Sequence, residues 1–142
     1  MASAFQRILQ THQWLYEKTD GLVGHRLLGM PTLLLRTTGR KTGLPRTNAL
    51  SYFPDGEARL VVASNGGSPR APGWLANLRA APETEIQVGR RRQKAIARVT
   101  LPDDPDYARR WALANAGNAD RYNAYQKKTS RPIPIVELRP VP

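Results

Sequence analysis

One stretch of the sequence, residues 37–50, constrains the fold more than any other. It reads Thr-Thr-Gly-Arg-Lys-Thr-Gly-Leu-Pro-Arg-Thr-Asn-Ala-Leu and follows an apolar run of three leucines. An apolar run, a polar segment between glycines and a second β-prone run predict strand, tight loop and strand. Because glycine accepts a positive φ, Gly39 and Gly43 would let the loop curl with its N–H groups turned inward.

The loop that these glycines bracket is basic. Arg40, Lys41 and Arg46, together with the hydroxyl of Thr42, suit a phosphate or a polycarboxylate. An ordinary solvated hairpin loop would have the same composition, and the loop residues alone do not choose between the two. A P-loop of the nucleotide triphosphatases is excluded, because its lysine follows the second glycine and precedes a helix. Here Lys41 comes before the glycine, and β-prone residues follow.

Composition narrows the classes of protein that remain. The chain has 142 residues, which favours one domain, and no cysteine, which excludes disulfides, thiolate metal sites and a cysteine nucleophile. The two isolated histidines, His12 and His25, are more typical of packing or surface positions than of a metal site. No segment is apolar enough to span a bilayer and no signal-peptide pattern is present, so we expect a cytoplasmic protein. The net charge of +11 favours an anionic partner.

The pattern along the chain is mainly β. Strands are predicted over residues 33–38, 47–53, 59–64, 85–88, 92–100 and 133–138, the last at a sheet edge because it holds Pro134. Helices are predicted over 4–18 and 73–81, then from a cap at Asp104 to Gly117, and from a cap at Asn118 to about residue 128. Short connections imply antiparallel pairing. The sequence thus predicts a mainly β domain of the α+β class, a small, partly open barrel of six antiparallel strands. It forms one domain over 1–142, with a helix in 1–20 and the barrel in 31–142.

A second stretch whose residues suit ligand binding follows the third predicted strand. Residues 61–67 end in a hydroxyl, an amide and two glycines, which would let a flat ring or a phosphate approach the backbone closely. A short helix then begins near Gly73, and its first N–H groups favour an anion. Trp74 would be core or a pocket wall, and Asn77, one turn on, a polar handle on the same face.

Four linked motifs now stand in order between residues 31 and 138. They are Thr-Gly-Arg-Lys-Thr-Gly-x-x-Arg, Ala-Ser-x-Gly-Gly, Pro-x-Trp-x-x-Asn-Leu, and Tyr-x-x-Tyr-Gln ahead of Ile-Pro-Ile-Val. Together they resemble the deazaflavin-dependent nitroreductase and quinone reductase family. The resemblance implies a split β-barrel of the flavin-reductase type that binds the reduced 8-hydroxy-5-deazaflavin coenzyme F-420. Such proteins deliver hydride to quinones, nitro compounds or activated alkenes.

The resemblance also assigns roles to residues. The cofactor's phosphate and polyglutamate tail would meet Arg40, Lys41, Thr42 and Arg46. The deazaflavin ring and ribityl chain would be lined by Thr47, Asn48, Ala49, Leu50, Ser51, Val62, Ala63, Ser64 and Asn65. The short helix beside them would contribute Gly73, Trp74, Leu75, Ala76 and Asn77. Tyr122 and Tyr125 would lie over the substrate side of the ring, with Tyr122 also touching the cofactor. Donors to the charge that develops on the substrate oxygen would be Ser64, Tyr122 or Tyr125.

Other functions and partners stay open at this stage. A flavin-mononucleotide oxidoreductase on the same barrel would use the basic loop for a single phosphate. A nucleic-acid-binding domain would explain the charge, but the aromatic residues do not interleave with the basic ones as a base-stacking platform requires. We therefore expect a small-molecule hydride acceptor and no nucleic acid. The basic helix over 4–18, with Trp14, also suits contact with the inner face of a membrane, although packing on its own domain is the preferred interpretation.

Overall fold

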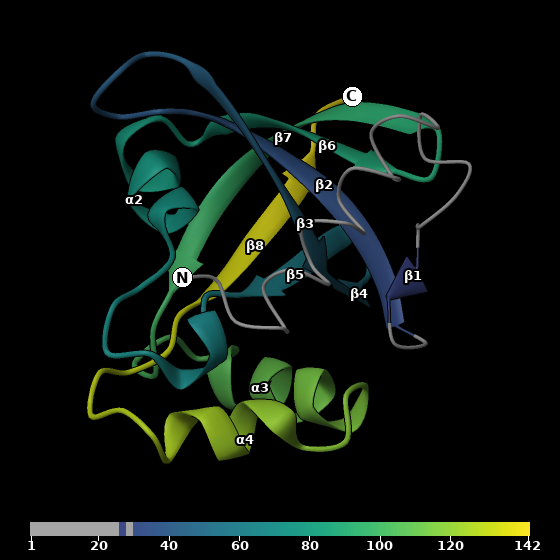
Figure 1. The fold of residues 1–142 in the computed structure, drawn as a ribbon. Coiled ribbons are helices and arrows are strands. Elements are labelled where there is room, and N and C mark those ends of the chain that lie inside the picture. Colours follow the sequence, from purple (N-terminus) through teal and green to yellow (C-terminus); the bar gives the residue numbers. More distant parts are fainter. Residues whose placement is uncertain (1–25, 28–29) are drawn as a thin grey trace.

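The computed structural model describes residues 26–27 and 30–142, and these form a mainly β protein with three α-helices (Figure 1). No helix in these ranges is long and apolar enough to cross a membrane. The strands of the described ranges are β1 (Arg26–Leu27), β2 (Met30–Thr38), β3 (Pro45–Ser51), β4 (Phe53–Asp55), β5 (Ala58–Val62), β6 (Glu83–Val88), β7 (Arg91–Thr100) and β8 (Ile135–Pro140). The helices are the 3-10 turn η1 (Asn65–Gly67), α2 (Gly73–Ala80), α3 (Tyr107–Ala116) and α4 (Arg121–Gln126).

The strands form one curled antiparallel sheet. Its order is β1-β2-β6-β7-β8-β5-β4, and β3 pairs with the other side of β2. A single residue, Tyr52, separates β3 from β4, and its N–H donates to the carbonyl of Pro31 at 3.2 Å. Because β3 pairs with β2 while β4 pairs with β5, this short junction joins the two ends of the sheet, and the sheet curls round on itself (Figure 1).

Three sequence predictions about the strands and helices need correction. The described residues contain eight strands, not six, because the predicted strand 47–53 breaks at Tyr52 and β1 was not foreseen. The last strand, β8, lies inside the sheet between β7 and β5 and not at an edge. Pro134 is compatible with that place because it precedes the strand, and its carbonyl accepts the N–H of Ala63 at 3.0 Å. Asn118 caps no helix, since α4 begins after Ala119 and Asp120, which both have positive φ. The predicted helix over 4–18 lies outside the described residues.

Part of the sheet is buried on both faces, and there neighbouring residues of one strand enter different cores, whereas β7 alternates buried and exposed residues. Successive side chains of a strand point to opposite faces, so Val61 joins the core inside the curl while Leu60 and Val62 join a second core outside it. Helix α2 closes the inner core with Trp74 and Leu75. Helices α3 and α4 cover the outer core, at the opposite end of the sheet from the loop between β2 and β3 (Figure 1).

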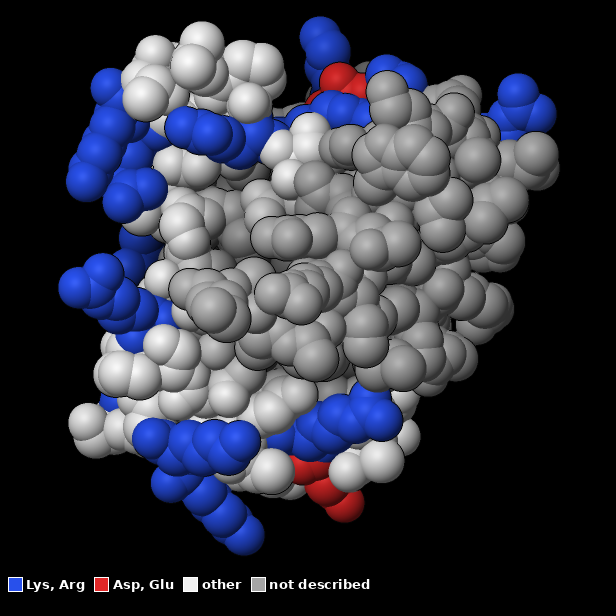
Figure 2. All heavy atoms as spheres, viewed as in Figure 1, with Lys and Arg blue, Asp and Glu red and all other residues white. Residues whose placement is uncertain are grey.

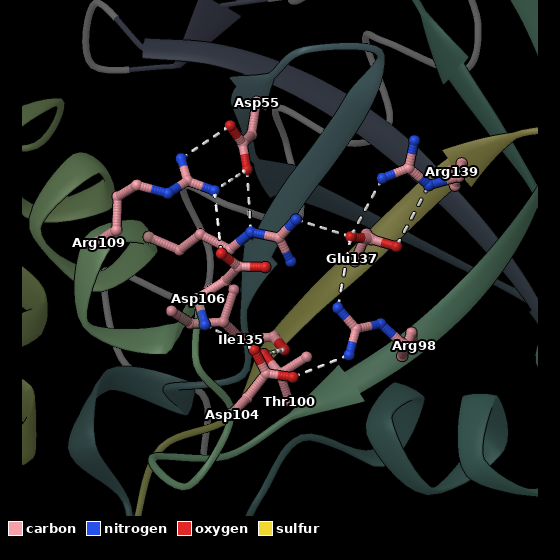
Figure 3. Close-up of polar contacts among 10 residues, drawn as sticks. Asp55, Arg98, Thr100, Asp104, Asp106, Arg109, Ile135, Glu137 and Arg139 are labelled. Carbon is pink, nitrogen blue, oxygen red and sulfur yellow. Dashed lines mark hydrogen bonds and ion pairs between the residues drawn. The ribbon is translucent and has the colours of Figure 1, made fainter.

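A charged network fastens α3 to two strands (Figure 3). Arg110, which is only 4% exposed, donates through Nε to Asp55 on β4 at 2.9 Å and through Nη2 to Glu137 on β8 at 2.7 Å. Arg109 binds both oxygens of Asp55 at 3.0 Å. Buried charges are tolerated when they are paired and hydrogen-bonded, so this network fixes the position of α3 on the outer core.

The same contacts lower the pKa values of Asp55 and Glu137. The hydrogen bond from Arg109 is the main cause that lowers the pKa of Asp55; burial opposes it and Arg110 adds to it. Burial alone would raise the pKa of Glu137, but the hydrogen bonds from Arg110 and Arg139 outweigh it, so this pKa also lies below its ordinary value. A carboxylate with a depressed pKa contributes stability above its unfolded value and loses it as the pH falls through the folded value.

Replacing Arg110 by Ala should therefore destabilise the fold by about 3 kcal/mol, because the buried Glu137 and the partly buried Asp55 each lose a partner. Urea unfolding at neutral pH measures this loss. Arg109→Ala, on the exposed side of Asp55, is the matched control and should cost much less. Wild-type stability should decline as the pH falls below the ordinary values of 4.5 for Glu137 and 3.8 for Asp55, and more steeply than that of Arg110→Ala. Equal losses in the two arginine variants would contradict the assignment.

Candidate functional site

The loop between β2 and β3 is held by its own backbone. The N–H of Gly39 donates to the carbonyl of Leu44 at 2.8 Å, and the N–H of Gly43 donates to the carbonyl of Gly39 at 2.7 Å. The N–H of Leu44 donates to Oγ1 of Thr42 at 3.2 Å. Most of the loop's N–H groups are thus used within the protein, which leaves few of them for the predicted cradle of inward N–H groups.

The two loop glycines serve different needs. Gly43 has φ of +71°, a conformation that favours glycine, as predicted. Gly39 does not have a positive φ, so that part of the prediction was wrong. A Cβ on Gly39 would lie 2.8 Å from Oγ1 of Thr42 and 3.2 Å from the carbonyl of Leu44. Gly39 is therefore required for space inside the turn.

Asn77 on α2 connects the helix to this loop. It is 6% exposed, and its Oδ1 accepts the backbone N–H of Arg40 at 3.1 Å and Nη1 of Arg40 at 3.2 Å. Its Nδ2 donates to Oγ1 of Thr37 at 3.1 Å. Nη1 of Arg40 also lies 3.4 Å from the carbonyl of Gly73, at the start of α2. The Asn77 amide is thus engaged by the protein itself, and it fixes the loop against the helix.

Between the loop and α2 lies a pocket of about 300 Å³. Three cations reach it, Arg40, Lys41 and Arg46, and none of them pairs with a carboxylate of the described residues. Lys and Arg atoms gather on the same side of the molecule, where Figure 1 places the loop and α2 (Figure 2). Uncompensated cations around a concave site attract an anion. The residues that line the pocket are Gly39, Arg40, Lys41, Thr42, Arg46, Asn48, Gly73, Trp74 and Asn77.

Only some of the residues predicted to bind the cofactor line the pocket. On β3, Arg46 and Asn48 line it and Leu50 packs on the inner core. Strand alternation places Thr47, Ala49 and Ser51 on the opposite face. Other predicted residues are also outside the pocket lining: Leu75 is buried in the inner core, Val62 in the outer core, and Ala63, Ser64, Asn65 and Ala76 lie outside the set that lines it.

The Ser64 loop is shaped mainly by its contact with α4. Ser64 is 7% exposed, and Asn65, Gly66 and Gly67 after it all have positive φ. A Cβ on Gly67 would lie 2.7 Å from the carbonyl of Tyr125, so this glycine permits α4 to approach. A Cβ on Gly66 would meet nothing within 4 Å. Close packing within the protein thus accounts for Gly67, for which the sequence had suggested a ligand.

Tyr122 and Tyr125 lie in the outer core and do not line the pocket. Their ring centroids are 6.1 Å apart, in an edge-to-face contact. Tyr122 is 7% exposed and packs edge-on against Phe53 at 5.8 Å. Burial is the main cause that raises the pKa of Tyr122, so its hydroxyl stays protonated over the physiological range. Their predicted contact with substrate stays a prediction.

Sequence reasoning missed several residues that shape the site. Thr37 was read only as part of a strand, yet it fixes the Asn77 amide. Arg131 was not singled out, yet its guanidinium holds the Ser64 loop through three carbonyls. No pattern in the sequence marks either residue, because each acts on a segment more than 35 positions away.

A curled antiparallel sheet with a basic pocket at the start of a helix defines a small β-protein whose pocket suits an anionic ligand. The sequence model described as "F420H(2)-dependent quinone reductase" matches residues 8–140, and the chain belongs to this family. An F420H(2)-dependent quinone reductase of Mycobacterium tuberculosis is 53% identical over 133 residues, which cover 93% of this chain and 89% of that protein.

Two solved structures are similar in fold and sequence. One, described as an F420-H2 dependent reductase, has a TM-score of 0.69 and 32% identity, and the match covers 77% of this chain and 94% of that one. The other, described as a domain-swapped dimer, has a TM-score of 0.70 and 30% identity, and covers 91% and 99%. The predicted family resemblance is thereby confirmed.

The position of Asn77 generates a prediction. Asn77→Ala removes the acceptor of the Arg40 N–H and the donor to Thr37, and should cost about 1–3 kcal/mol in unfolding free energy, because a buried polar group loses its partner. Asn77→Asp keeps an acceptor for Arg40 and should lose less. Urea unfolding of the two variants beside wild type measures the difference. An Ala variant as stable as wild type would show that the amide does not hold the loop.

Proposed function

We propose that the protein is an oxidoreductase that uses the reduced deazaflavin coenzyme F-420 to transfer hydride to a quinone, on a split β-barrel of the flavin-reductase type. The observation that carries the proposal is the pocket of about 300 Å³ whose three cations have no carboxylate partner among the described residues. Family membership and the 53% identity to a mycobacterial quinone reductase support the same activity. Nitro compounds and activated alkenes are further acceptors of the same electrophilic class.

The groups around the pocket fit the anionic tail of this cofactor. A phosphate followed by γ-linked glutamates presents negatively charged acceptor oxygens at neutral pH, and the pocket offers guanidinium, ammonium, hydroxyl and N–H donors. Arg40 is turned toward Asn77 and Gly73, whereas the side chains of Lys41 and Arg46 have no hydrogen bond or ion pair with a described residue. We therefore assign the tail to Lys41 and Arg46, with Arg40 as a fixed positive charge beside them.

The ring end of the site follows from the same assignment. When bound, a reduced 5-deazaflavin supplies the hydride. The protein's part is to hold the ring and the acceptor in a geometry ready for attack, which supplies much of the rate. We propose that Ser64, Tyr122 and Tyr125 face the acceptor. The packing of Gly67 against Tyr125 supports this, since it brings the Ser64 loop and α4 together.

Cofactor identity is the direct test. Fluorescence titration of the purified protein should show binding of the deazaflavin cofactor in preference to flavin mononucleotide. The pocket has several cations, which suit the extended anionic tail of the deazaflavin cofactor better than the single phosphate of flavin mononucleotide. Addition of the reduced cofactor and a soluble quinone should then give cofactor oxidation. Tight binding of flavin mononucleotide with no deazaflavin binding would overturn the proposal.

The basic loop gives a second test. Lys41→Ala or Arg46→Ala should weaken cofactor affinity by about 1.5–3 kcal/mol, the scale of a hydrogen bond to a charged group. The loss should shrink at high salt, which already screens exposed charges. Arg90→Ala removes an exposed cation at the tip of the β6–β7 hairpin and is the matched control, expected to bind normally. A truncated cofactor without phosphate and glutamates should be insensitive to all three changes. Normal binding of the full cofactor by both loop variants would place its tail elsewhere.

Conversion of each tyrosine to Phe tests the acceptor side. If Tyr122 or Tyr125 donates to the acceptor oxygen, its Phe variant should keep the fold and cofactor affinity while kcat/KM falls roughly ten- to a hundredfold. Tyr107→Phe is the control, because its hydroxyl donates to the carbonyl of Ile133 at 2.6 Å within the same core. That variant should lose stability and keep its kinetics. Unchanged kinetics in both test variants would leave Ser64 as the donor.

A further inference from the structure

The connection between α4 and β8 carries an arginine with an unusual set of partners. The guanidinium of Arg131 donates from Nη1 to the carbonyl of Ala63 at 3.2 Å and from Nη2 to that of Ser64 at 2.8 Å. Its Nε donates to the carbonyl of Ser68 at 3.0 Å. It makes no ion pair with a carboxylate of the described residues, and burial lowers its pKa. All three donating nitrogens are thus spent on the backbone of one loop.

Arg131 is itself fixed from the side of α4. The side chain of Gln126 donates to the carbonyl of Arg131 at 2.8 Å and accepts the N–H of Ile133 at 3.0 Å. The N–H of Arg131 donates to Oγ1 of Thr129 at 3.3 Å. These bonds attach the segment to the end of α4, so the guanidinium presents a rigid fork to the Ser64 loop.

The loop that Arg131 contacts has a backbone conformation that needs support from residues outside the loop. Asn65 has φ of +45°, a sparsely populated conformation for a residue other than glycine, and Gly66 and Gly67 follow with φ of +65° and +84°. Within the loop, the N–H of Gly67 donates to the carbonyl of Ser64 at 2.9 Å, and the N–H of Ser68 donates to that of Asn65 at 3.1 Å. Such a conformation persists when surrounding contacts hold it.

We propose that Arg131 is a positioning residue for hydride transfer, which joins Ser64 and the α4 tyrosines into one rigid unit. The inference rests on the proposed function, in which Ser64 and these tyrosines face the acceptor. The planar guanidinium reaches three carbonyls at once. A lysine keeps the charge but presents its donors from one nitrogen, so it does not reproduce the fork. Arg131→Lys therefore separates geometry from charge.

The first measurement uses the protein without cofactor. Hydrogen exchange of the Gly67 and Ser68 amides reports opening of the loop. In Arg131→Lys these amides should exchange about tenfold faster or more, while amides of β2 and β6 keep their rates. Arg90→Lys is the same exchange at an exposed hairpin tip and should leave the loop unchanged. Wild-type exchange at both amides in Arg131→Lys would overturn the inference.

The second measurement tests whether the loop acts in the reaction. With reduced deazaflavin and a quinone, Arg131→Lys should lower kcat by about ten- to a hundredfold, the effect of a misplaced reacting group. The KM for the cofactor should stay within about twofold, because the tail contacts are untouched. In a Ser64→Ala background the further loss should be smaller, because the part that comes from a misplaced Ser64 is already gone. An equal fall in both backgrounds would overturn the inference.

The two proposals fail in different ways. A wild-type protein without deazaflavin-dependent turnover would overturn the proposed function, and the exchange rates would still decide whether Arg131 holds the loop. Faster loop exchange with unchanged kcat would confirm the tie and overturn its role in positioning the reaction.

Discussion

Burial of β2, β5 and β8 on both faces of one curled sheet is the constraint on which this structure depends. Because the side chains of a strand alternate, each buried strand must supply apolar residues to two cores, and β5 does so with Leu60, Val61 and Val62. The inner core needs a cap, which α2 provides, and the outer core needs a cover, which α3 and α4 provide (Figure 1). The helices therefore lie at fixed places on the sheet, and the loops that precede them are brought to its two ends.

Two groups of cations have different roles. Arg98, Arg109, Arg110 and Arg139 contact Asp55, Asp104 or Glu137, and this network attaches α3 to the sheet (Figure 3). Arg40, Lys41 and Arg46 pair with no described carboxylate and surround the pocket. A paired buried charge holds structure, whereas an unpaired partly exposed charge is available to a ligand. Three of the 22 Lys and Arg residues thus surround the pocket specifically.

Helix α2 links the two roles of the fold. Trp74 and Leu75 close the inner core, while Asn77, on the same helix, engages Arg40 and Thr37. The pocket wall is therefore as rigid as the core packing behind it. Asn77, predicted as a polar contact for a ligand, instead hydrogen-bonds the protein's own loop. This contact orders the loop before a ligand binds and lowers the entropic cost of binding.

The local pattern predicted much of this arrangement. The strand–loop–strand reading of residues 37–50, the helix near Gly73 and the curled antiparallel sheet follow from spacing and turn chemistry, which act over a few residues. The break at Tyr52 was not predictable, because it depends on the pairing of β4 with β5. The internal position of β8 was not predictable either, because it depends on the pairing of β8 with β5 and β7. The positive φ at Ala119 also opposes the usual preference of alanine.

By itself the sequence determined the family, the basic loop, the overall charge and the alternation of apolar residues, since each of these is a property of neighbouring positions. Only the tertiary structure decided which cations meet carboxylates and which do not, that Asn77 serves the loop, and that Arg131 spans to carbonyls 63 or more positions away. It also divided β3 into a face that lines the pocket and a face that does not. Such contacts join residues that are distant in the chain, so no local pattern records them; they arise when the curled sheet brings its two ends together.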